Sequence, residues 1–300
     1  MKKILLDGGL GQELLARWGK PAHPLWSAQV MMEAPELVQS IHEDYIRAGA
    51  KVITTNSYIL TPERLTREGV PDQFRPLQQL AIDLANAARD AVGIDVDIAG
   101  CLPPLHGSYK PDLSRSADFL YEKYREIAVE QVGKVDLMIC ETLASISEVK
   151  GATKAALELG VDVWTSMTAD DDHMGKLRSG EDIIDAIVAL KELKPHGVLF
   201  NCSRPETIDV ILSELAIFDH YGAYANGFTH IGGLEVGGTV ASLSARQDLT
   251  SEKYAEFAMA WIESEANIVG GCCETTPAHI SVLSKRMLDA GLEISTWRNR

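Results

Sequence analysis

The chain has 300 residues, of which 46% are hydrophobic and 24% charged, an ordinary composition for a soluble globular protein. Its formal net charge is −15 and no cluster of Lys and Arg interrupts this acidity, which excludes a phosphate-binding face for nucleic acid. The first apolar run stops at Asp7, too early for a signal peptide, and no stretch reaches the roughly 20 apolar residues of a membrane span. We therefore expect a cytoplasmic protein without a membrane or nucleic-acid partner.

Short β-branched or apolar runs alternate with longer amphipathic runs along the chain, which predicts alternating strands and helices. The predicted strands, in chain order, cover residues 2–9, 50–58, 96–104, 135–143, 161–169, 196–203, 222–228 and 265–273. The predicted helices that follow them cover residues 35–49, 74–92, 117–133, 146–160, 180–193, 205–218, 251–264 and 277–288.

Eight strand–helix units of similar length predict an α/β protein whose residues 1–300 form a single (β/α)8 TIM barrel. The competing fold is a doubly wound open sheet. The chain lacks the glycine fingerprint of a dinucleotide-binding sheet, and the glycine-rich segment 232–238 follows no clear strand. We therefore favour the barrel and expect segment 232–238 to be a loop.

Polar and thiol side chains fall at the carboxyl end of most predicted strands, where the active sites of such barrels lie. They are Asp7, Asn56, Tyr58, Cys101, Cys140, Glu141, Asn201, Cys202, Cys272 and Cys273. Packing alone does not place polar groups at the same end of so many strands. The pattern therefore indicates a functional site at this rim.

Two adjacent cysteines, Cys272 and Cys273, follow two glycines at the end of the last predicted strand. The five cysteines are odd in number and lack the spacing of a disulfide framework. Cys202 ends the sixth strand, so three thiols are expected on one rim, a soft ligand set for Zn²⁺ that leaves a fourth position open. We expect Gly270 and Gly271 to let the backbone turn both neighbouring sulfurs toward one point. The alternative is that each thiol is merely a small buried apolar side chain.

Asp7 and Glu141, on the first and fourth strands, are candidates to hold an ammonium group together, while the backbone amides of residues 8–12 receive a carboxylate. The structural alternatives are a helix cap for each carboxylate and an ordinary turn after Asp7. Trp26 and Tyr58 are candidates to place aromatic faces beside a cationic donor. Alternatively, both rings pack over the mouth of the barrel.

Five motifs resemble those of the homocysteine S-methyltransferase family: LLDGGLGQEL, ITTNSY, ICET, FNCSRPE and IVGGCCETTPAHI. They run from residue 5 to residue 280, and the pairing of Asn-Cys with a later Gly-Gly-Cys-Cys is the most specific of them. The family includes S-methylmethionine-dependent and betaine-dependent enzymes and the homocysteine domain of cobalamin-dependent methionine synthase. The segment 25–38 resembles the S-methylmethionine branch more than the betaine branch.

This resemblance implies a zinc-dependent enzyme that moves a methyl group from S-methylmethionine or S-adenosylmethionine to the thiol of homocysteine, giving methionine. It implies that Zn²⁺ is bound by Cys202, Cys272 and Cys273. The residues it implies at the reacting groups are Asp7, Tyr58 and Glu141. The substrate-binding residues it implies are Asp7, Gly8, Gly9, Leu10, Gly11, Trp26, Asn56 and Glu141.

Two departures from the family pattern fall where a donor is expected. The family's Gly-Ser-x-Gly-Pro at the third strand reads Gly-Cys-Leu-Pro-Pro at residues 100–104, and residues 224–230 read YANGFTH where the S-methylmethionine branch tends to have Pro-Asn-Ser-Gly. These departures leave open the donor, including betaine or a corrinoid carrier protein. They also leave open the acceptor, including another thiol or a selenol.

Two further alternatives are not methyltransferases. One is a redox protein in which Cys272 and Cys273 form a reversible vicinal disulfide, which predicts a thiol count that changes with oxidant. The other is a structural zinc module, in which a fourth ligand such as Cys101 or Cys140 closes the site. The roles of these two cysteines and the oligomeric state, a homo-oligomer included, stay open.

Overall fold

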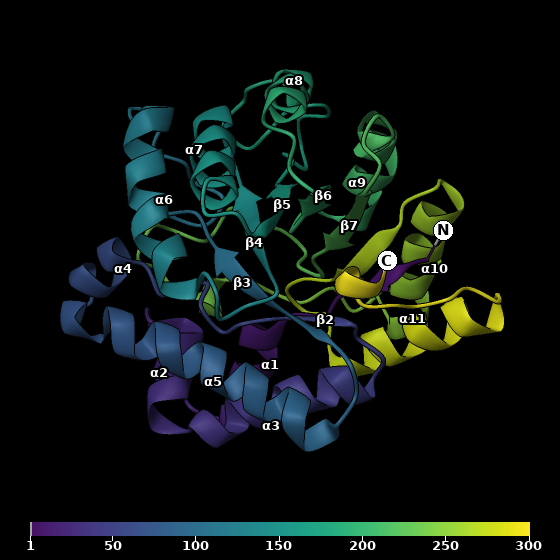
Figure 1. Cartoon of the computed structure of the whole chain (residues 1–300), viewed down its shortest axis with the longest axis horizontal. Coiled ribbons are helices and arrows are strands. Elements are labelled where there is room, and N and C mark those ends of the chain that lie inside the picture. The colour runs from purple at the N-terminus through teal and green to yellow at the C-terminus, as the bar shows by residue number, and fades with distance from the viewer. Residues whose placement is uncertain (1) are drawn as a thin grey trace.

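The computed structural model describes residues 2–300, in which an eight-stranded parallel sheet is surrounded by helices (Figure 1). The strands are β1 (Ile4–Leu5), β2 (Val52–Thr54), β3 (Asp97–Leu102), β4 (Leu137–Leu143), β5 (Asp162–Met167), β6 (Gly197–Asn201), β7 (Tyr221–Ala225) and β8 (Ile268–Gly271). The α-helices are α1 (Leu10–Trp18), α2 (Trp26–Glu33), α3 (Pro35–Arg47), α4 (Pro62–Arg67), α5 (Phe74–Val92), α6 (Ala117–Gln131), α7 (Ile146–Leu157), α8 (Ile183–Leu193), α9 (Pro205–Ile211), α10 (Ser251–Glu263) and α11 (Pro277–Asp289). Short 3-10 helices are η1 (Pro71–Gln73), η2 (Leu212–Leu215), η3 (Val240–Ser242) and η4 (Trp297–Asn299).

The strands follow the order β1-β8-β7-β6-β5-β4-β3-β2, and backbone contacts then join β1 to β2. Leu6 pairs with Val52 in a parallel bridge, and the amide of Lys51 donates to the carbonyl of Leu5 at 2.7 Å. The sheet therefore closes nearly completely, and the predicted (β/α)8 barrel is confirmed.

Side chains on successive strand positions alternate between the barrel interior and the layer beneath the helices. In β4, Leu137 and Ile139 belong to the interior cluster, whereas Met138 and Cys140 belong to the larger cluster between sheet and helices. The same alternation turns Glu141 inward at the end of the strand. This parity decides which of the neighbouring residues Cys140 and Glu141 can reach the mouth of the barrel.

The sequence of helix α5 explains which face of the helix is buried and where the helix ends. Its apolar residues Leu77, Ala81, Ala85 and Ala88 recur at helical spacing and are buried against the sheet. Gly93 ends the helix in the left-handed conformation, with a φ of 69°. The observed bounds of α5 coincide with the predicted helix 74–92.

Helices α1, α2 and α4 were not predicted. Gly9, which precedes α1, has no side chain to cap the helix, and Leu25, which precedes α2, makes no cap either. Without the usual start signal, α1 and α2 have no clear sequence signature, whereas α4 does have one, in Thr61, which caps the helix, and Pro62. The predicted helix 205–218 is also wrong in its second half, where α9 gives way to the 3-10 helix η2. Segment 232–238 is a loop, as expected.

The end of the barrel opposite the candidate site is closed by the C-terminal segment. Trp297 donates from Nε1 to the Asp162 carboxylate at 2.6 Å, and its ring packs edge-on against that of Trp164 at 5.1 Å between centroids. Lys3 pairs with Ile294, so the two ends of the chain lie near each other (Figure 1).

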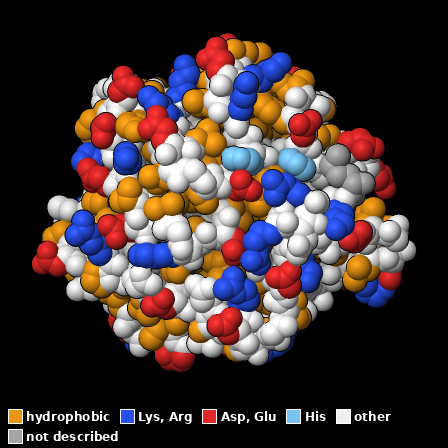
Figure 2. Space-filling model, in the orientation of Figure 1, with side chains coloured by type: hydrophobic (Ala, Val, Ile, Leu, Met, Phe, Trp, Pro, Cys, Tyr) orange, Lys and Arg blue, Asp and Glu red, His pale blue; other side chains and the backbone are white. Residues whose placement is uncertain are grey.

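On the molecular face shown in Figure 2, acidic and basic side chains are interspersed. None of the helices in residues 2–300 is long and apolar enough to cross a membrane.

Candidate active site

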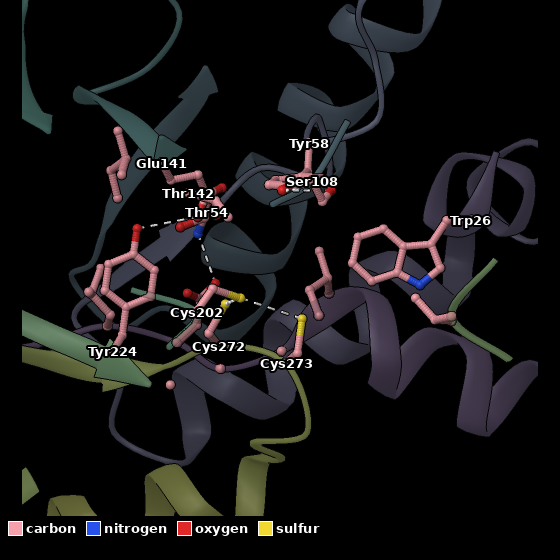
Figure 3. Close-up of a pocket in the computed structure, with 18 of the residues that line it drawn as sticks. Trp26, Thr54, Tyr58, Ser108, Glu141, Thr142, Cys202, Tyr224, Cys272 and Cys273 are labelled. Carbon is pink, nitrogen blue, oxygen red and sulfur yellow. Dashed lines mark hydrogen bonds between the residues drawn. The ribbon is translucent and has the colours of Figure 1, made fainter. Parts of the chain in front are cut away.

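A cavity lies at the carboxyl ends of the strands, and the empty space in and in front of it, open solvent included, is about 880 Å³ (Figure 3). Of the predicted site residues, those that line it are Asp7, Gly8, Gly9, Leu10, Trp26, Asn56, Tyr58, Glu141, Cys202, Cys272 and Cys273. Gly11 does not line it and instead lies beneath the Trp26 ring, where a Cβ atom would fall 2.2 Å from Cζ2. The strand-end pattern in the sequence thus corresponds to one shared cavity.

The three thiols converge at the floor of this cavity. Cys202 Sγ lies 2.6 Å from Cys272 Sγ and 3.8 Å from Cys273 Sγ, and all three sulfurs lie within 4.8 Å of one another (Figure 3). Three sulfurs around one tetrahedral Zn²⁺ at about 2.3 Å stand roughly 3.8 Å apart. The donor set and the Cys202–Cys273 distance fit a single soft metal ion bound by three protein ligands, and the Cys202–Cys272 distance would have to lengthen to hold one.

Strand β7 holds the two cysteine-bearing strand ends in place. The amide of Cys202 donates to the carbonyl of Tyr224 at 3.1 Å, and the amide of Cys272 donates to Ala225 at 3.0 Å. Asn226 donates from Nδ2 to the carbonyl of Cys202 at 2.7 Å.

Cys202 itself has a φ of 52°, in the left-handed region that non-glycine residues seldom adopt. Such backbone strain is typical of functional sites, because the surrounding contacts must impose it.

The two glycines before the cysteine pair act through their missing Cβ atoms, as the sequence predicts, and not through a positive φ. Neither Gly270 nor Gly271 has a positive φ, so neither uses the conformational freedom of glycine. A Cβ atom on Gly270 would lie 2.3 Å from Leu6 Cβ, and one on Gly271 would lie 2.0 Å from Thr275 Oγ1. The glycines therefore let β8 approach β1 and the following turn closely, which brings the cysteine pair to the cavity floor.

The thiols and a tyrosine form one hydrogen-bonded group. Burial opposes ionisation of Cys202, but hydrogen bonds from Cys272, Cys273 and Tyr109 outweigh it and hold the pKa of Cys202 well below its usual value. Hydrogen bonding to Cys202 is the main cause that raises the pKa of Cys272 and of Cys273. The Tyr109 hydroxyl lies 3.1 Å from Cys202 Sγ. Without a metal the negative charge thus lies mainly on one sulfur, whereas a metal held by all three sulfurs would require each thiol to be deprotonated.

Two carboxyls, buried Asp7 and half-buried Glu141, face the same cavity. Asp7 accepts from the amide of Thr54 at 2.8 Å, whereas Glu141 accepts from Cys101 Sγ at 2.9 Å and from the Tyr224 hydroxyl at 3.3 Å. Burial raises the pKa of Asp7 to about 8 and that of Glu141 to about 7. No ion pair within residues 2–300 includes either carboxyl. Two such groups are receptive to an ammonium group, which would restore their ionised forms.

In the loop before α1, backbone amides and not side chains are the candidates to bind a carboxylate. The amide of Gly9 donates to Thr275 O at 2.8 Å, and that of Leu10 donates to Gly8 O at 2.9 Å, so both are already used. Gly11 and Gln12 stand in the first turn of α1, where amides have no partner within the helix. A helix N-terminus of this kind attracts a carboxylate. Gly11 and Gln12 do not line the cavity, whereas Gly8, Gly9 and Leu10 do, so carboxylate binding by the backbone of this segment stays a prediction.

Aromatic side chains form one wall. The rings of Trp26 and Tyr58 meet edge to face with centroids 6.0 Å apart, and both line the cavity. The Tyr58 hydroxyl donates to Ser108 Oγ at 3.0 Å. Asn56 also lines the cavity, but its amide donates to the carbonyl of Ser27 at 3.2 Å and so ties the loop after β2 to α2.

Sequence reasoning missed several cavity residues. Tyr109 lies in the irregular loop after β3, and no local pattern distinguishes it from other loop tyrosines. Tyr224 lies in β7 and belongs to the interior cluster, a position that strand alternation would have indicated had the strand been placed securely. Phe228 lies beyond the end of that strand.

The remaining cysteines do not join the thiol cluster of residues 2–300. Cys101 faces inward, but its thiol donates to Glu141, and Cys140 packs in the core beneath the helices. Burial raises the pKa of both thiols. A closed site with Cys101 or Cys140 as fourth ligand therefore does not match this arrangement.

A parallel barrel with a three-thiol cluster and two carboxyls at its strand ends defines an enzyme of the (β/α)8 class with a candidate metal centre. The sequence profile of the homocysteine S-methyltransferase family matches residues 4–287. The chain therefore belongs to that family of enzymes.

Relatives and solved structures agree with this assignment over nearly the whole chain. Homocysteine S-methyltransferase of Escherichia coli strain K12 is 28% identical over 94% of both chains, and YbgG of Bacillus subtilis, also named a homocysteine S-methyltransferase, is 27% identical over 94% and 93%. The metallated crystal structure of the E. coli homocysteine methyltransferase MmuM has a TM-score of 0.79, is 28% identical and covers 95% of this chain and 96% of its own.

Proposed function

We propose that this chain is a zinc-dependent methyltransferase that moves a methyl group from a sulfonium donor to the thiol of homocysteine, giving methionine. S-methylmethionine is the foremost donor and S-adenosylmethionine the second. The observation that carries the proposal is the convergence of three thiols with two carboxyls in one cavity. The names of the relatives and the metallated state of the E. coli structure support it.

Each group has a role set by its chemistry. Zn²⁺ on the three thiols would lower the pKa of the homocysteine thiol and leave its sulfur nucleophilic at neutral pH. Asp7 and Glu141 would accept the ammonium group, and the first amides of α1 the carboxylate. Trp26 and Tyr58 would lie beside the cationic donor. The site thus mainly positions two substrates relative to each other.

The reaction balances without a further co-reactant. A bond forms between the homocysteine sulfur and the methyl carbon while the bond from that carbon to the donor sulfur breaks. The electron pair of the broken bond stays on the donor sulfur, which becomes a neutral thioether, and the thiol proton is released. With S-methylmethionine as donor, both organic products are methionine.

The test is the zinc content of the purified, reduced protein, with X-ray absorption at the zinc edge before and after homocysteine is added. We expect about one zinc per chain with three sulfur neighbours, rising to four with homocysteine. Four protein sulfurs that do not respond to homocysteine would instead support a structural zinc module. No zinc, together with a thiol count that changes with oxidant, would support the vicinal-dithiol protein.

The donor is tested separately by incubating the zinc-loaded protein and homocysteine with each candidate. Methionine formed from S-methylmethionine or S-adenosylmethionine is the expected result. Methionine formed only from betaine, or only with a corrinoid carrier protein, would keep the acceptor and replace the donor. Methylation of a different thiol or selenol in preference to homocysteine would replace the acceptor.

A further inference from the structure

A second cavity of about 480 Å³ adjoins the one described above. The two share as walls Trp26, Tyr58, Ser108, Leu234 and Val240. The thiols line only the first cavity, so a molecule with its reacting group at the sulfurs would extend past the aromatic wall into the second. The chemistry of the second cavity therefore bears on the part of the donor that does not react.

The second cavity is lined by a buried arginine without a counter-ion. Arg64, in α4, is 3% exposed, and no ion pair within residues 2–300 includes it. Its Nη2 donates to the carbonyl of Pro104 at 2.8 Å, but its Nε has no hydrogen-bond partner. A buried cation in this condition is costly unless an anion joins it.

The other charged groups that line the second cavity are already paired. Arg67 pairs with Glu68 at 3.2 Å, and Glu235 pairs with Lys110 at 2.6 Å. Arg64 is therefore the charged side chain in this cavity that an incoming anion would meet without first breaking an ion pair.

Tyr58 connects Arg64 to the reacting group. The guanidinium carbon of Arg64 lies 5.4 Å from the centroid of the Tyr58 ring. Burial raises the pKa of Tyr58, the charge of Arg64 opposes that rise, and Cys202 adds to it, so the phenol lies within electrostatic range of both. A donor whose cationic end lies beside Tyr58 would thus have the thiols on one side and Arg64 on the other.

We propose that Arg64 binds the carboxylate of the methyl donor, so that this enzyme selects donors carrying a sulfonium or ammonium group and a carboxylate in one molecule. This inference rests on the proposed function and sharpens it. The aromatic wall receives the cationic end and Arg64 the anionic end, in a geometry that a donor without a carboxylate cannot satisfy. The acceptor's carboxylate keeps its separate place at the start of α1.

The test compares S-methylmethionine with its carboxamide at about pH 6, below the amine pKa of the amide, so that the amide keeps both positive charges and loses only the negative one. Binding of each is measured by titration calorimetry to metal-free, reduced protein, so that neither zinc nor methyl transfer enters the result. We expect the acid to bind about tenfold or more tightly than the amide, since a charge-assisted hydrogen bond is lost. Equal affinities, or an acid that does not bind, would overturn the proposal.

Variants then assign the preference to one side chain. In Arg64→Gln the acid and the amide should bind about equally, and in Arg64→Lys part of the preference should remain. The matched control is Arg67→Gln, three positions further along α4, which should keep the preference because Arg67 is already paired with Glu68. A preference that survives in Arg64→Gln, or disappears in Arg67→Gln, would refute the assignment.

Two further outcomes separate this inference from its premises. A rise in the dissociation constant of homocysteine in Arg64→Gln, with donor binding unchanged, would show that Arg64 serves the acceptor and would overturn the inference. Preferential acid binding without any methyl transfer in the zinc-loaded protein would keep the Arg64 site and remove the proposed reaction.

Because Arg64→Gln also loses the hydrogen bond to Pro104, the thermal midpoint of each variant is measured first. If Arg64→Gln does not fold, the wild-type comparison and Arg64→Lys decide the question.

Discussion

At the scale of single residues, the cavity holds two carboxyls whose protonation depends on what binds beside them. Asp7 is buried and Glu141 is half-buried, and no ion pair within residues 2–300 includes either carboxyl. Burial raises their pKa values to about 8 and about 7, so both carboxyls titrate near neutral pH. An ammonium group between them would favour the ionised forms and lower both pKa values.

This linkage predicts pH-dependent binding of methionine, which carries the ammonium and carboxylate of homocysteine without its thiol. Above about pH 8 Asp7 is ionised and attracts the ammonium group, and as the pH falls through about 8 and then 7 the carboxyls protonate. Affinity should therefore fall about tenfold or more between pH 8.5 and roughly pH 6. Titration calorimetry checks this, and Asp7→Asn should bind weakly with a flatter pH profile. A dissociation constant that is constant over this range would contradict it.

Single thiols offer a matched pair of variants. Cys272→Ala removes one of three converging sulfurs and should abolish zinc retention and methyl transfer together. Cys140→Ala removes a thiol from the core beneath the helices, so it should keep zinc and activity and lose only about 1 kcal/mol of stability. Zinc content by elemental analysis and methionine formation are the measurements. Full activity in metal-free Cys272→Ala would end the proposed mechanism.

At the scale of elements, the site depends on how closely the loop before α1 approaches the end of β8. A Cβ atom on Gly9 would lie 2.5 Å from the carbonyl oxygen of Cys272 and 3.1 Å from the Cα atom of Cys273. Both neighbours are backbone atoms, which cannot rotate away as a flexible side chain would. The loop that holds Asp7 and the strand end that holds the cysteine pair therefore need glycine at this position.

Gly9→Ala should accordingly displace one of these segments and weaken methionine binding and zinc retention about tenfold or more. The control is Gly19→Ala at the other end of α1, where no atom lies within 4 Å of the added Cβ. Because Gly19 has a φ of 71°, this control should cost about 1 kcal/mol of stability and leave binding intact. Equal effects of both substitutions on zinc retention would show that general destabilisation, and not the close approach, is responsible.

At the scale of the whole molecule, the two ends of the barrel carry different functions. The candidate site lies where the strands end, whereas the opposite end is filled by Trp297 and its partners Asp162 and Trp164. Trp297 is 1% exposed and belongs to the interior cluster. Contacts at this end hold the barrel together without touching the site.

Trp297→Ala should therefore lower the free energy of unfolding by about 3–5 kcal/mol, because it leaves a large cavity beneath the barrel. Zinc content and the Michaelis constants should not change at a temperature where the variant is folded. Chemical denaturation and steady-state kinetics at 25 °C measure the two effects. Loss of zinc from a fully folded variant would show that the two ends are coupled.

Much of this molecule follows from short-range pattern in the sequence. Hydrophobic periodicity is a local property, so the eight strands and the helix 74–92 were predictable, and strand ends located Asp7, Glu141 and the cysteines. The glycines and cysteines of the last strand were also conspicuous, and the missing Cβ atoms of Gly270 and Gly271 are needed, as predicted, here for close packing. Helices α1 and α2 escaped prediction because they begin without a capping side chain.

The rest was decided by tertiary structure. Tyr109 reaches Cys202, and Arg64 lies beside Tyr58, across loops whose paths no local pattern specifies. The raised pKa values of the two carboxyls likewise arise from burial by residues distant in sequence. The sequence by itself determined the barrel and most of the polar groups at its mouth, because strand alternation and strand order dictate those positions. Closure of the barrel and the packing of loops over it decided which groups touch, because contact between distant segments depends on the whole fold.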